Sequence, residues 1–170
     1  LMKLSNLSFP EAVTQISKRY GIPLPTRVQG KNAGSPKESH TDEREKYFTL
    51  NRLVTEYFHQ NLLREKCGRA AQDYLKERNI SSKTIKKFFI GYADKTWDSL
   101  LKHFRKKNVD LGELEKAGLI KSKESGAGYY DCFRDRIIFP IIGHDNNIRG
   151  FGGRDISLNE KAPKYINSPE

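Results

Sequence analysis

The chain has 170 residues and a formal net charge of +10, from 31 basic and 21 acidic side chains. This length suits one domain, with room for a small appendage. No apolar run approaches the roughly 18 residues of a membrane-spanning helix, and no signal-peptide pattern opens the chain, so we expect no membrane partner. The basic excess favours an anionic partner, nucleic acid first, although a solvated lysine-rich face explains the same charge.

The positions of the cysteines and histidines bear on disulfides, cellular location and zinc binding. Cys67 and Cys132 lie far apart in the sequence, which predicts no disulfide framework and favours a cytosolic location. The four histidines are scattered, whereas structural zinc usually takes four close Cys or His ligands, so we expect no zinc site in these residues. The opening residues Leu1-Met2-Lys3 suggest a fragment of a longer protein.

The N-terminal part predicts one short helix and a linker. Ser8 and Glu11 have the spacing of a capping box, and apolar residues follow at helical intervals. Gly21 ends the helix, which we expect over residues 9–20. Residues 26–40 are polar, with Gly, Ser and Pro, and are typical of a linker.

A long helical pattern follows the linker. It starts at Thr41, keeps one apolar face, is interrupted at Gly68 and ends at Arg78. Asn79 then suits the left-handed position after a helix end, because its short polar side chain tolerates that conformation.

Two shorter helices come next. Ser81 or Ser82 caps the first, and we expect its Phe88 and Phe89 in the core, not on a stacking platform. The second covers residues 98–107. Its outer face carries the densest positive patch of the chain, formed by Lys102, Arg105, Lys106 and Lys107.

From residue 119 onward, strands replace helices. Turn residues separate four short extended stretches, at residues 119–120, 129–130, 137–142 and 147–151. Pro140 lies inside the third stretch and predicts a sheet edge or a bulge there. The order, a helical N-terminal half followed by a small mixed or antiparallel sheet, predicts the α+β class.

A glycine cluster, Gly150-Phe-Gly-Gly-Arg154, has neither the spacing of a phosphate-binding loop nor that of a dinucleotide-binding turn. Two interpretations stay open. The glycines belong to a bulged or tightly packed strand, or they let a nucleic-acid strand approach the backbone closely, with Arg154 on a phosphate.

The segment 163–169 carries a cation, an aromatic ring and an amide within four residues. These groups suit contact with single-stranded nucleic acid, with Lys164 on a phosphate, Tyr165 stacked on a base and Asn167 hydrogen-bonded.

Arg134 and Arg136 form a further candidate pair. In an extended strand both lie on one face. Structural ion pairs with Asp131 or Asp135 are the alternative. We recognise no acidic cluster that would hold paired magnesium ions and no activated nucleophile, so these residues predict no catalytic site of their own.

Three ordered segments carry a family resemblance. "RDRIIFPI", "RGFGGR" and "PKYINSPE" resemble the start of the RNA polymerase domain of bacterial DnaG-type DNA primases. Residues 8–25 resemble the segment that closes the primase zinc-binding domain, and residues 68–104 resemble the helical entry to the polymerase domain. The resemblance implies three parts: a zinc-domain helix in residues 1–25, a linker in 26–40, and the N-terminal subdomain of the polymerase domain in 41–170. The Toprim subdomain would begin where this sequence stops.

The resemblance also implies an activity. Primases synthesise short RNA primers for replication on a single-stranded DNA template, and this segment would guide the template to a metal site in the Toprim part. The residues at matching template-binding positions are Arg78, Arg134, Arg136, Arg154, Lys164, Tyr165 and Asn167.

Cofactors and partners follow from the same resemblance. Magnesium would be held by the Toprim part and zinc by the zinc-binding domain, with neither bound by these residues. The implied partners are the template, ribonucleotides, the RNA–DNA primer duplex and the replicative helicase, the last through a separate C-terminal domain. The implied location is the bacterial replisome in the cytoplasm.

Three hypotheses follow. In the first, the chain is a primase segment that binds template weakly and is inactive alone. In the second, it is a complete, non-enzymatic basic module that binds single-stranded nucleic acid. In the third, it is a protein-interaction domain whose aromatic helices dock a partner.

Overall fold

The computed structural model describes residues 13–15, 17, 19, 37–124, 126, 128–157 and 161–169. The chain divides into two compact units, Leu1–Ser35 and Pro36–Glu170. In the first unit the described residues are helical, within the helix expected over residues 9–20. The expected capping box, Gly21 and the linker up to residue 36 lie outside the described residues. No described helix is both long and apolar enough to cross a membrane.

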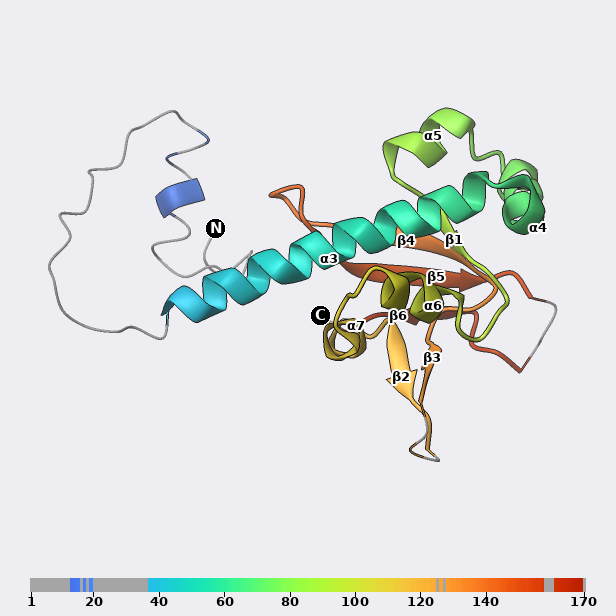
Figure 1. The fold of residues 1–170 in the computed structure, drawn as a ribbon. Helices are drawn as coiled ribbons and strands as arrows, with labels where there is room; N and C mark the ends of the chain where they lie inside the picture. Colours follow the sequence, from blue (N-terminus) through green and yellow to red (C-terminus); the bar gives the residue numbers. More distant parts are fainter. Residues whose placement is uncertain are drawn as a thin grey trace, which may run out of the picture. The chain divides into compact units, whose positions relative to one another are not determined.

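The second unit combines a long helix, four shorter helices and two antiparallel sheets (Figure 1). This confirms the α+β prediction. Its described elements, in chain order, are α3 (Lys37–Leu63), α4 (Glu65–Glu77), α5 (Ser82–Lys87), β1 (Gly91–Ala93), α6 (Ser99–Lys106), α7 (Leu111–Lys116), β2 (Ile120–Ser122), β3 (Tyr129–Asp131), β4 (Arg136–Ile142), β5 (Ile148–Asp155) and β6 (Tyr165–Asn167).

The main sheet has the strand order β1-β4-β5-β6, and β2 and β3 form a separate hairpin. In the main sheet Arg154 of β5 stands between Ile137 of β4 and Tyr165 of β6. Residues directly opposite in neighbouring strands share a face of the sheet. The register therefore places the side chains of Arg154 and Tyr165 next to each other, on the same face as Ile137.

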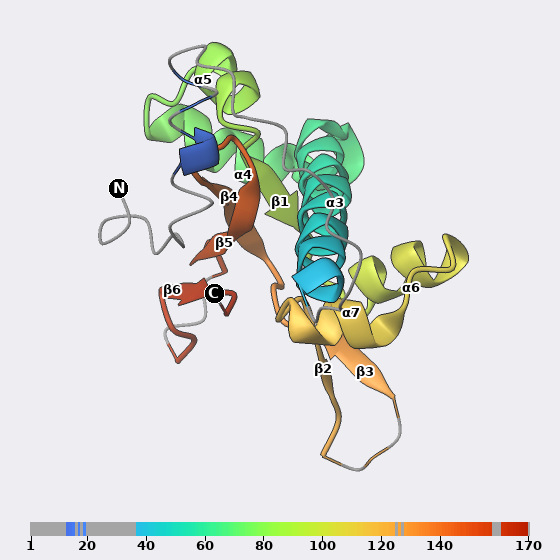
Figure 2. The ribbon, with the colours of Figure 1, turned by 90° about the vertical axis from the view of Figure 1, so that its left-hand side faces the viewer.

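One face of the sheet packs on α3, which also contacts α6 on its other side (Figure 2). Phe58 of α3 is the centre of this packing, with its ring 5.9 Å from that of Phe151 in β5 and 6.4 Å from that of Phe133. On the other side of α3, the ring of Tyr57 lies 5.8 Å from that of Phe104 in α6. The middle of α3 thus buries apolar side chains on two sides, while its remaining side is exposed.

The opposite face of the sheet is covered only in part. Leu75 of α4 packs with Tyr92 of β1 and Ile137 of β4 in a second, smaller core. Beyond that core, toward β6, Tyr165 and Asn167 are exposed on their strand. The second face of the sheet therefore carries an accessible strip next to α4, over β5 and β6.

Helix boundaries differ from the prediction in two places. α3 begins at Lys37, inside the range expected to be linker. The break after α3 falls at Arg64, not at Gly68, which lies within α4. A Cβ on Gly68 would lie 2.1 Å from the carbonyl oxygen of Leu62, so this glycine lets α4 approach the end of α3. Asn79 has φ 57°, the left-handed conformation predicted for it.

The expected burial of Phe88 and Phe89 is wrong. The two side chains are 49% and 48% exposed. Helix α5 ends at Lys87, and Phe89 has φ 49°, so the helical spacing that would turn both rings inward stops before them. Ser81, one of the two predicted caps, accepts a hydrogen bond from the amide of Thr84.

Pro140 lies in β4, between two other strands, yet its local surroundings are those of an edge. The pairing of β4 with β1 ends at Ile138, so no strand needs an amide donor from Pro140 on that side. A register shift follows between Ile141 and Ile142. The predicted edge or bulge thus corresponds to the end of the short neighbour β1.

Asp131, at the end of β3, caps α6 from outside the helix. Its carboxylate accepts hydrogen bonds from the amides of Leu100 at 2.8 Å and Leu101 at 3.1 Å. The residue is 2% exposed. Burial raises the pKa of the Asp131 carboxyl from 3.8 to about 6, and the two amide hydrogen bonds oppose the shift only in part.

This carboxyl predicts a dependence of stability on pH. The folded-state pKa lies above the unfolded value, so its stabilisation is complete below the unfolded pKa and is lost as the pH rises through the folded one. Between about pH 4 and about pH 5.5 the free energy of unfolding should fall by about 2 kcal/mol, because unfolding releases the proton that Asp131 holds in the folded state. Urea unfolding over this range measures it. The Asp131→Asn variant should lack this slope; an unchanged slope would assign it to other groups.

Candidate nucleic-acid interface

Arg154 lies between two tyrosine rings on the accessible strip of the sheet. Its guanidinium carbon is 5.1 Å from the ring centroid of Tyr165 and 5.4 Å from that of Tyr74 in α4. Its Nη1 also donates a hydrogen bond to the Tyr165 hydroxyl. Both ring distances fall within the range of cation–π attraction. The guanidinium is therefore held in place, while a guanidinium has five N–H donors and only some of them are used here.

Tyr74 extends this arrangement to a second arginine. The guanidinium carbon of Arg78 lies 5.3 Å from the Tyr74 ring centroid. Arg78 is four residues after Tyr74, the spacing at which helical side chains meet. The four side chains Arg78, Tyr74, Arg154 and Tyr165 alternate between cation and aromatic ring, and we call them the arginine–tyrosine ladder.

The ladder brings together three residues predicted from the sequence and one that was missed. Arg78, Arg154 and Tyr165 were candidates for template binding, whereas Tyr74 was expected only on the apolar face of a helix. The missed residue carried a local signal, since an aromatic residue four positions before an arginine on a helix places a ring under a cation.

Strand β6 presents two of the other predicted residues beside the ladder. Tyr165 is 58% exposed, and Asn167 is also exposed on the same side, because alternate residues of a strand share a face. Ile166, between them, packs against the main core. Lys164 is exposed just before the strand, and its carbonyl accepts a hydrogen bond from the backbone amide of Asp155 at 3.0 Å.

The glycines of β5 divide into two kinds. A Cβ on Gly153 would lie 2.5 Å from a ring carbon of buried Phe133, and one on Gly150 would lie 2.6 Å from the Ser168 hydroxyl. These two glycines are required by packing, as the tightly packed strand interpretation expected. A Cβ on Gly152 would lie 3.3 Å from the Asn167 Oδ1 atom, at the end of a side chain, and 3.9 Å from the Phe139 carbonyl oxygen. Packing therefore gives little reason for a glycine there.

Arg136 does not lie on the accessible strip. It is 6% exposed, and its guanidinium donates hydrogen bonds to the carbonyl oxygens of Gly153 at 3.3 Å and Pro163 at 2.9 Å. Burial lowers the pKa of this guanidinium, with Asp155 opposing the shift. The side chain fixes the chain segment that precedes β6, so its guanidinium is occupied by the protein's own backbone.

Arg134 points elsewhere again. Its guanidinium carbon lies 4.1 Å from the Trp97 ring centroid and 5.4 Å from that of Tyr130. The two arginines would share a face only in an extended strand, but Asp135 between them has φ 50°. The expectation of one shared face is therefore wrong for this pair. The alternative was an ion pair with Asp131 or Asp135. The structure shows a different contact, in which Arg134 donates a hydrogen bond to the backbone carbonyl of Asp131.

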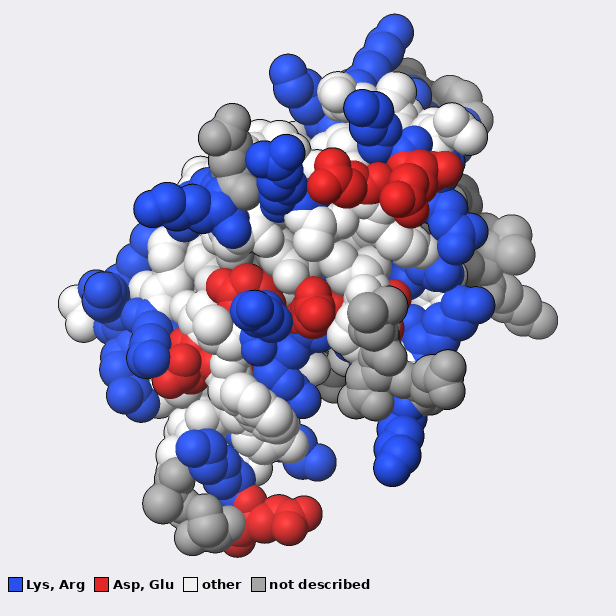
Figure 3. All heavy atoms as spheres, turned by 90° about the vertical axis from the view of Figure 1, so that its right-hand side faces the viewer, with Lys and Arg blue, Asp and Glu red and all other residues white. Residues whose placement is uncertain are grey.

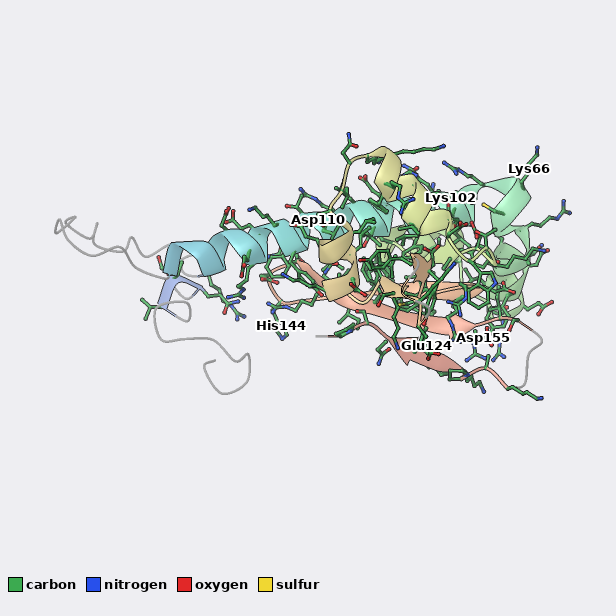
Figure 4. All side chains as sticks on the ribbon, turned by 60° about the horizontal axis from the view of Figure 1, so that its bottom comes forward. Lys66, Lys102, Asp110, Glu124, His144 and Asp155 are labelled. Atoms are coloured by element: carbon green, nitrogen blue, oxygen red, sulfur yellow. The ribbon has the colours of Figure 1, made fainter. Side chains whose placement is uncertain are left out.

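The densest positive patch of the sequence lies away from the ladder. Helix α6 packs on the α3 side of the sheet through Leu100 and Phe104, whereas the ladder lies on the α4 side. Figure 4 labels Lys102 on α6 and Asp155, the neighbour of Arg154 at the end of β5. On the face drawn in Figure 3, basic side chains alternate with acidic groups and uncharged surface and form no continuous basic field.

Metal ligands do not gather in the part of the chain that the structure describes. There, no three His, Cys, Asp or Glu side chains lie close enough to hold a metal ion.

Comparison with known proteins identifies the family. Residues 57–170 match the family described as DNA primase catalytic core, N-terminal domain. The DNA primase of Synechococcus elongatus is 38% identical over the whole chain, which spans 24% of that relative.

Solved structures agree. A structure of the DnaG primase catalytic domain bound to ssDNA has a TM-score of 0.69 and 33% identity, over 76% of this chain and 41% of that one. The Aquifex aeolicus primase structure with zinc-binding and RNA polymerase domains has a TM-score of 0.65 and 28% identity, over 97% of this chain and 36% of that one. The chain spans about a quarter of the first curated relative and belongs to the DnaG-type DNA primase family.

Proposed function

We propose that this chain is the template-guiding segment of a bacterial DNA primase that makes RNA primers on single-stranded DNA. The observation that carries the proposal is the arginine–tyrosine ladder on an accessible strip of the sheet. Alternating cations and aromatic rings suit single-stranded nucleic acid, because phosphates are attracted by the cations and bases stack on the rings.

Each residue of the strip has a role in this proposal. Arg78 and Arg154 bind phosphates, each in an orientation set by the Tyr74 ring. Tyr165 offers its exposed ring to a base, and Asn167 on the same face offers an amide for hydrogen bonding. Lys164 adds a flexible cation at the start of β6. Gly152, opposite Asn167, has no side chain of its own, so a strand could approach its backbone closely once the Asn167 side chain moves aside.

Chemistry in this proposal belongs to residues outside the chain. Magnesium would be held by a Toprim part and zinc by a zinc-binding domain. Ribonucleotides and the RNA–DNA primer duplex would meet the template at that Toprim site. Helicase contact would use a C-terminal domain. The segment alone would bind template and synthesise no primer.

Salt dependence of binding tests the proposal. Fluorescence anisotropy of labelled single-stranded DNA, titrated at several salt concentrations, gives the slope of log affinity against log salt. The Arg154→Ala/Lys164→Ala variant should lower the magnitude of this slope by about 1.4, since each lost phosphate contact on single strands removes about 0.7. A matched Lys106→Ala/Lys107→Ala variant removes the same charge from the end of α6 and should change the slope less. The opposite ranking would place the template on α6.

A further inference from the structure

Trp97, the only tryptophan of the chain, is largely exposed although several contacts fix its position. It precedes α6 and is 63% exposed, more than any other large apolar side chain among the described residues. Its backbone carbonyl accepts a hydrogen bond from the amide of Asp131 at 2.8 Å. A tryptophan that is held by several contacts and still exposes its ring offers a surface on which a base can stack.

The ring of Trp97 is supported from one side. The guanidinium carbon of Arg134 lies over the ring, 4.1 Å from its centroid, and Arg134 is itself tethered to the carbonyl of Asp131. The ring of Tyr130 stands nearly edge-on, with centroids 6.0 Å apart and an interplanar angle of 65°. The arginine also lies 5.4 Å from the Tyr130 centroid. These contacts orient the indole before any ligand arrives, which lowers the entropy lost on binding.

Arg134 and Lys121 place two cations at this cluster. Lys121 of β2 stands directly opposite Tyr130 of β3 and is exposed, so its ammonium adds to the charge of Arg134. The acidic side chains nearby have partners of their own. Asp98 forms an ion pair with Lys102 at 3.0 Å, and Asp94 accepts a hydrogen bond from the amide of Thr96.

The carboxylate of Asp131 is likewise occupied by the two α6 amides, and Glu115 accepts a hydrogen bond from the amide of Ser122 at 3.1 Å. Among the described residues, neither Arg134 nor Lys121 forms an ion pair with these carboxylates.

We infer that Trp97, with Tyr130 and Arg134, is a second nucleic-acid contact that stacks on one unpaired base. The indole provides the stacking surface, Arg134 supports it from beneath, and Lys121 and Arg134 attract the phosphates on either side of that base. The inference rests on the proposed function only for the ligand class, single-stranded nucleic acid. It needs no contact between this cluster and the ladder.

The fluorescence of Trp97 reports on this site directly, because the chain has no other tryptophan. A short oligothymidylate should quench it in a saturable way. An abasic oligodeoxynucleotide of equal length has the same phosphates but no bases, and it should leave the emission unchanged. Equal quenching by both, or no quenching by oligothymidylate at concentrations where anisotropy shows binding, would overturn the inference. Oligouridylate distinguishes a DNA strand from an RNA strand as the source of the stacked base. Stronger quenching by oligouridylate than by oligothymidylate would assign the base to RNA.

Substitution separates this site from the ladder. By anisotropy, Trp97→Ala should weaken oligothymidylate binding about 5- to 150-fold, the range for loss of one stacked ring, and Trp97→Phe should weaken it less. Circular dichroism checks that both variants fold. Wild-type affinity of Trp97→Ala would overturn this inference and leave the ladder untouched. Conversely, if Arg154→Ala binds as the wild type does while Trp97 is still quenched, the ladder is wrong and this site stands.

Discussion

The Arg154→Ala variant is expected to bind single-stranded DNA about 10- to 150-fold more weakly than the wild type. A charge-assisted hydrogen bond contributes about 1.5–3 kcal/mol, which corresponds to that range of affinity. The expected loss exceeds that of one charge, because Tyr74 and Tyr165 orient the Arg154 guanidinium, which would then bind a phosphate without reorienting. Anisotropy titration at fixed salt measures the change.

Two variants control for charge alone. Arg154→Lys keeps the charge but loses the planar group between the rings, so it should recover only part of the affinity. Arg149→Ala removes an arginine from the same strand, where Arg149 forms an ion pair with Asp145 at 3.2 Å. It should bind nearly as the wild type does. Equal losses in Arg149→Ala and Arg154→Ala would show that net charge, not the ladder, determines binding.

Adjacent glycines should respond in opposite ways to the same substitution. Gly153→Ala should lower the free energy of unfolding by about 3 kcal/mol, because the new Cβ would lie 2.5 Å from a ring carbon of buried Phe133. Gly152→Ala should change it by less than about 0.5 kcal/mol, since the atom nearest the Cβ is at the end of the Asn167 side chain. Urea unfolding of the two variants measures both effects.

Binding should separate the two glycines as well. Gly152→Ala should fold normally yet weaken single-stranded DNA binding about fivefold, which corresponds to about 1 kcal/mol for a methyl group placed under the strand. Any loss of binding in Gly153→Ala should follow the loss of folded protein. A Gly152→Ala variant with unchanged stability and unchanged affinity would show that single-stranded DNA does not approach the backbone closely at Gly152.

Local patterns predicted most elements of the fold. Helices with a clear apolar stripe, α6 among them, and strands bounded by turn residues, such as β3, were expected near their observed positions. Local patterns could not predict where a helix stops or where a neighbouring strand ends. Phe88 and Phe89 kept helical spacing in sequence, but α5 stops at Lys87. Pro140 suggested an edge, but the reason is the short length of β1, which the sequence near Pro140 does not contain.

The candidate site shows the same division between local and distant information. Arg154 and Tyr165 were recognised as candidates, yet only the pairing of β5 with β6 places them in contact. Tyr74 was not a candidate, because an apolar stripe cannot distinguish a buried ring from one at the border of the core. Arg134 and Arg136 were grouped by their spacing. Because Asp135 between them is left-handed, their side chains lie in different surroundings. Alternation arguments fail wherever the backbone is not extended.

Ultraviolet cross-linking to an oligothymidylate, followed by mass spectrometry of the linked peptides, tests most directly whether the ladder is the template site. We expect cross-links at Tyr165 or Tyr74, and these should be reduced in the Arg154→Ala variant. Cross-links confined to α6, among the residues 99–107 that carry the densest positive patch of the sequence, would contradict it.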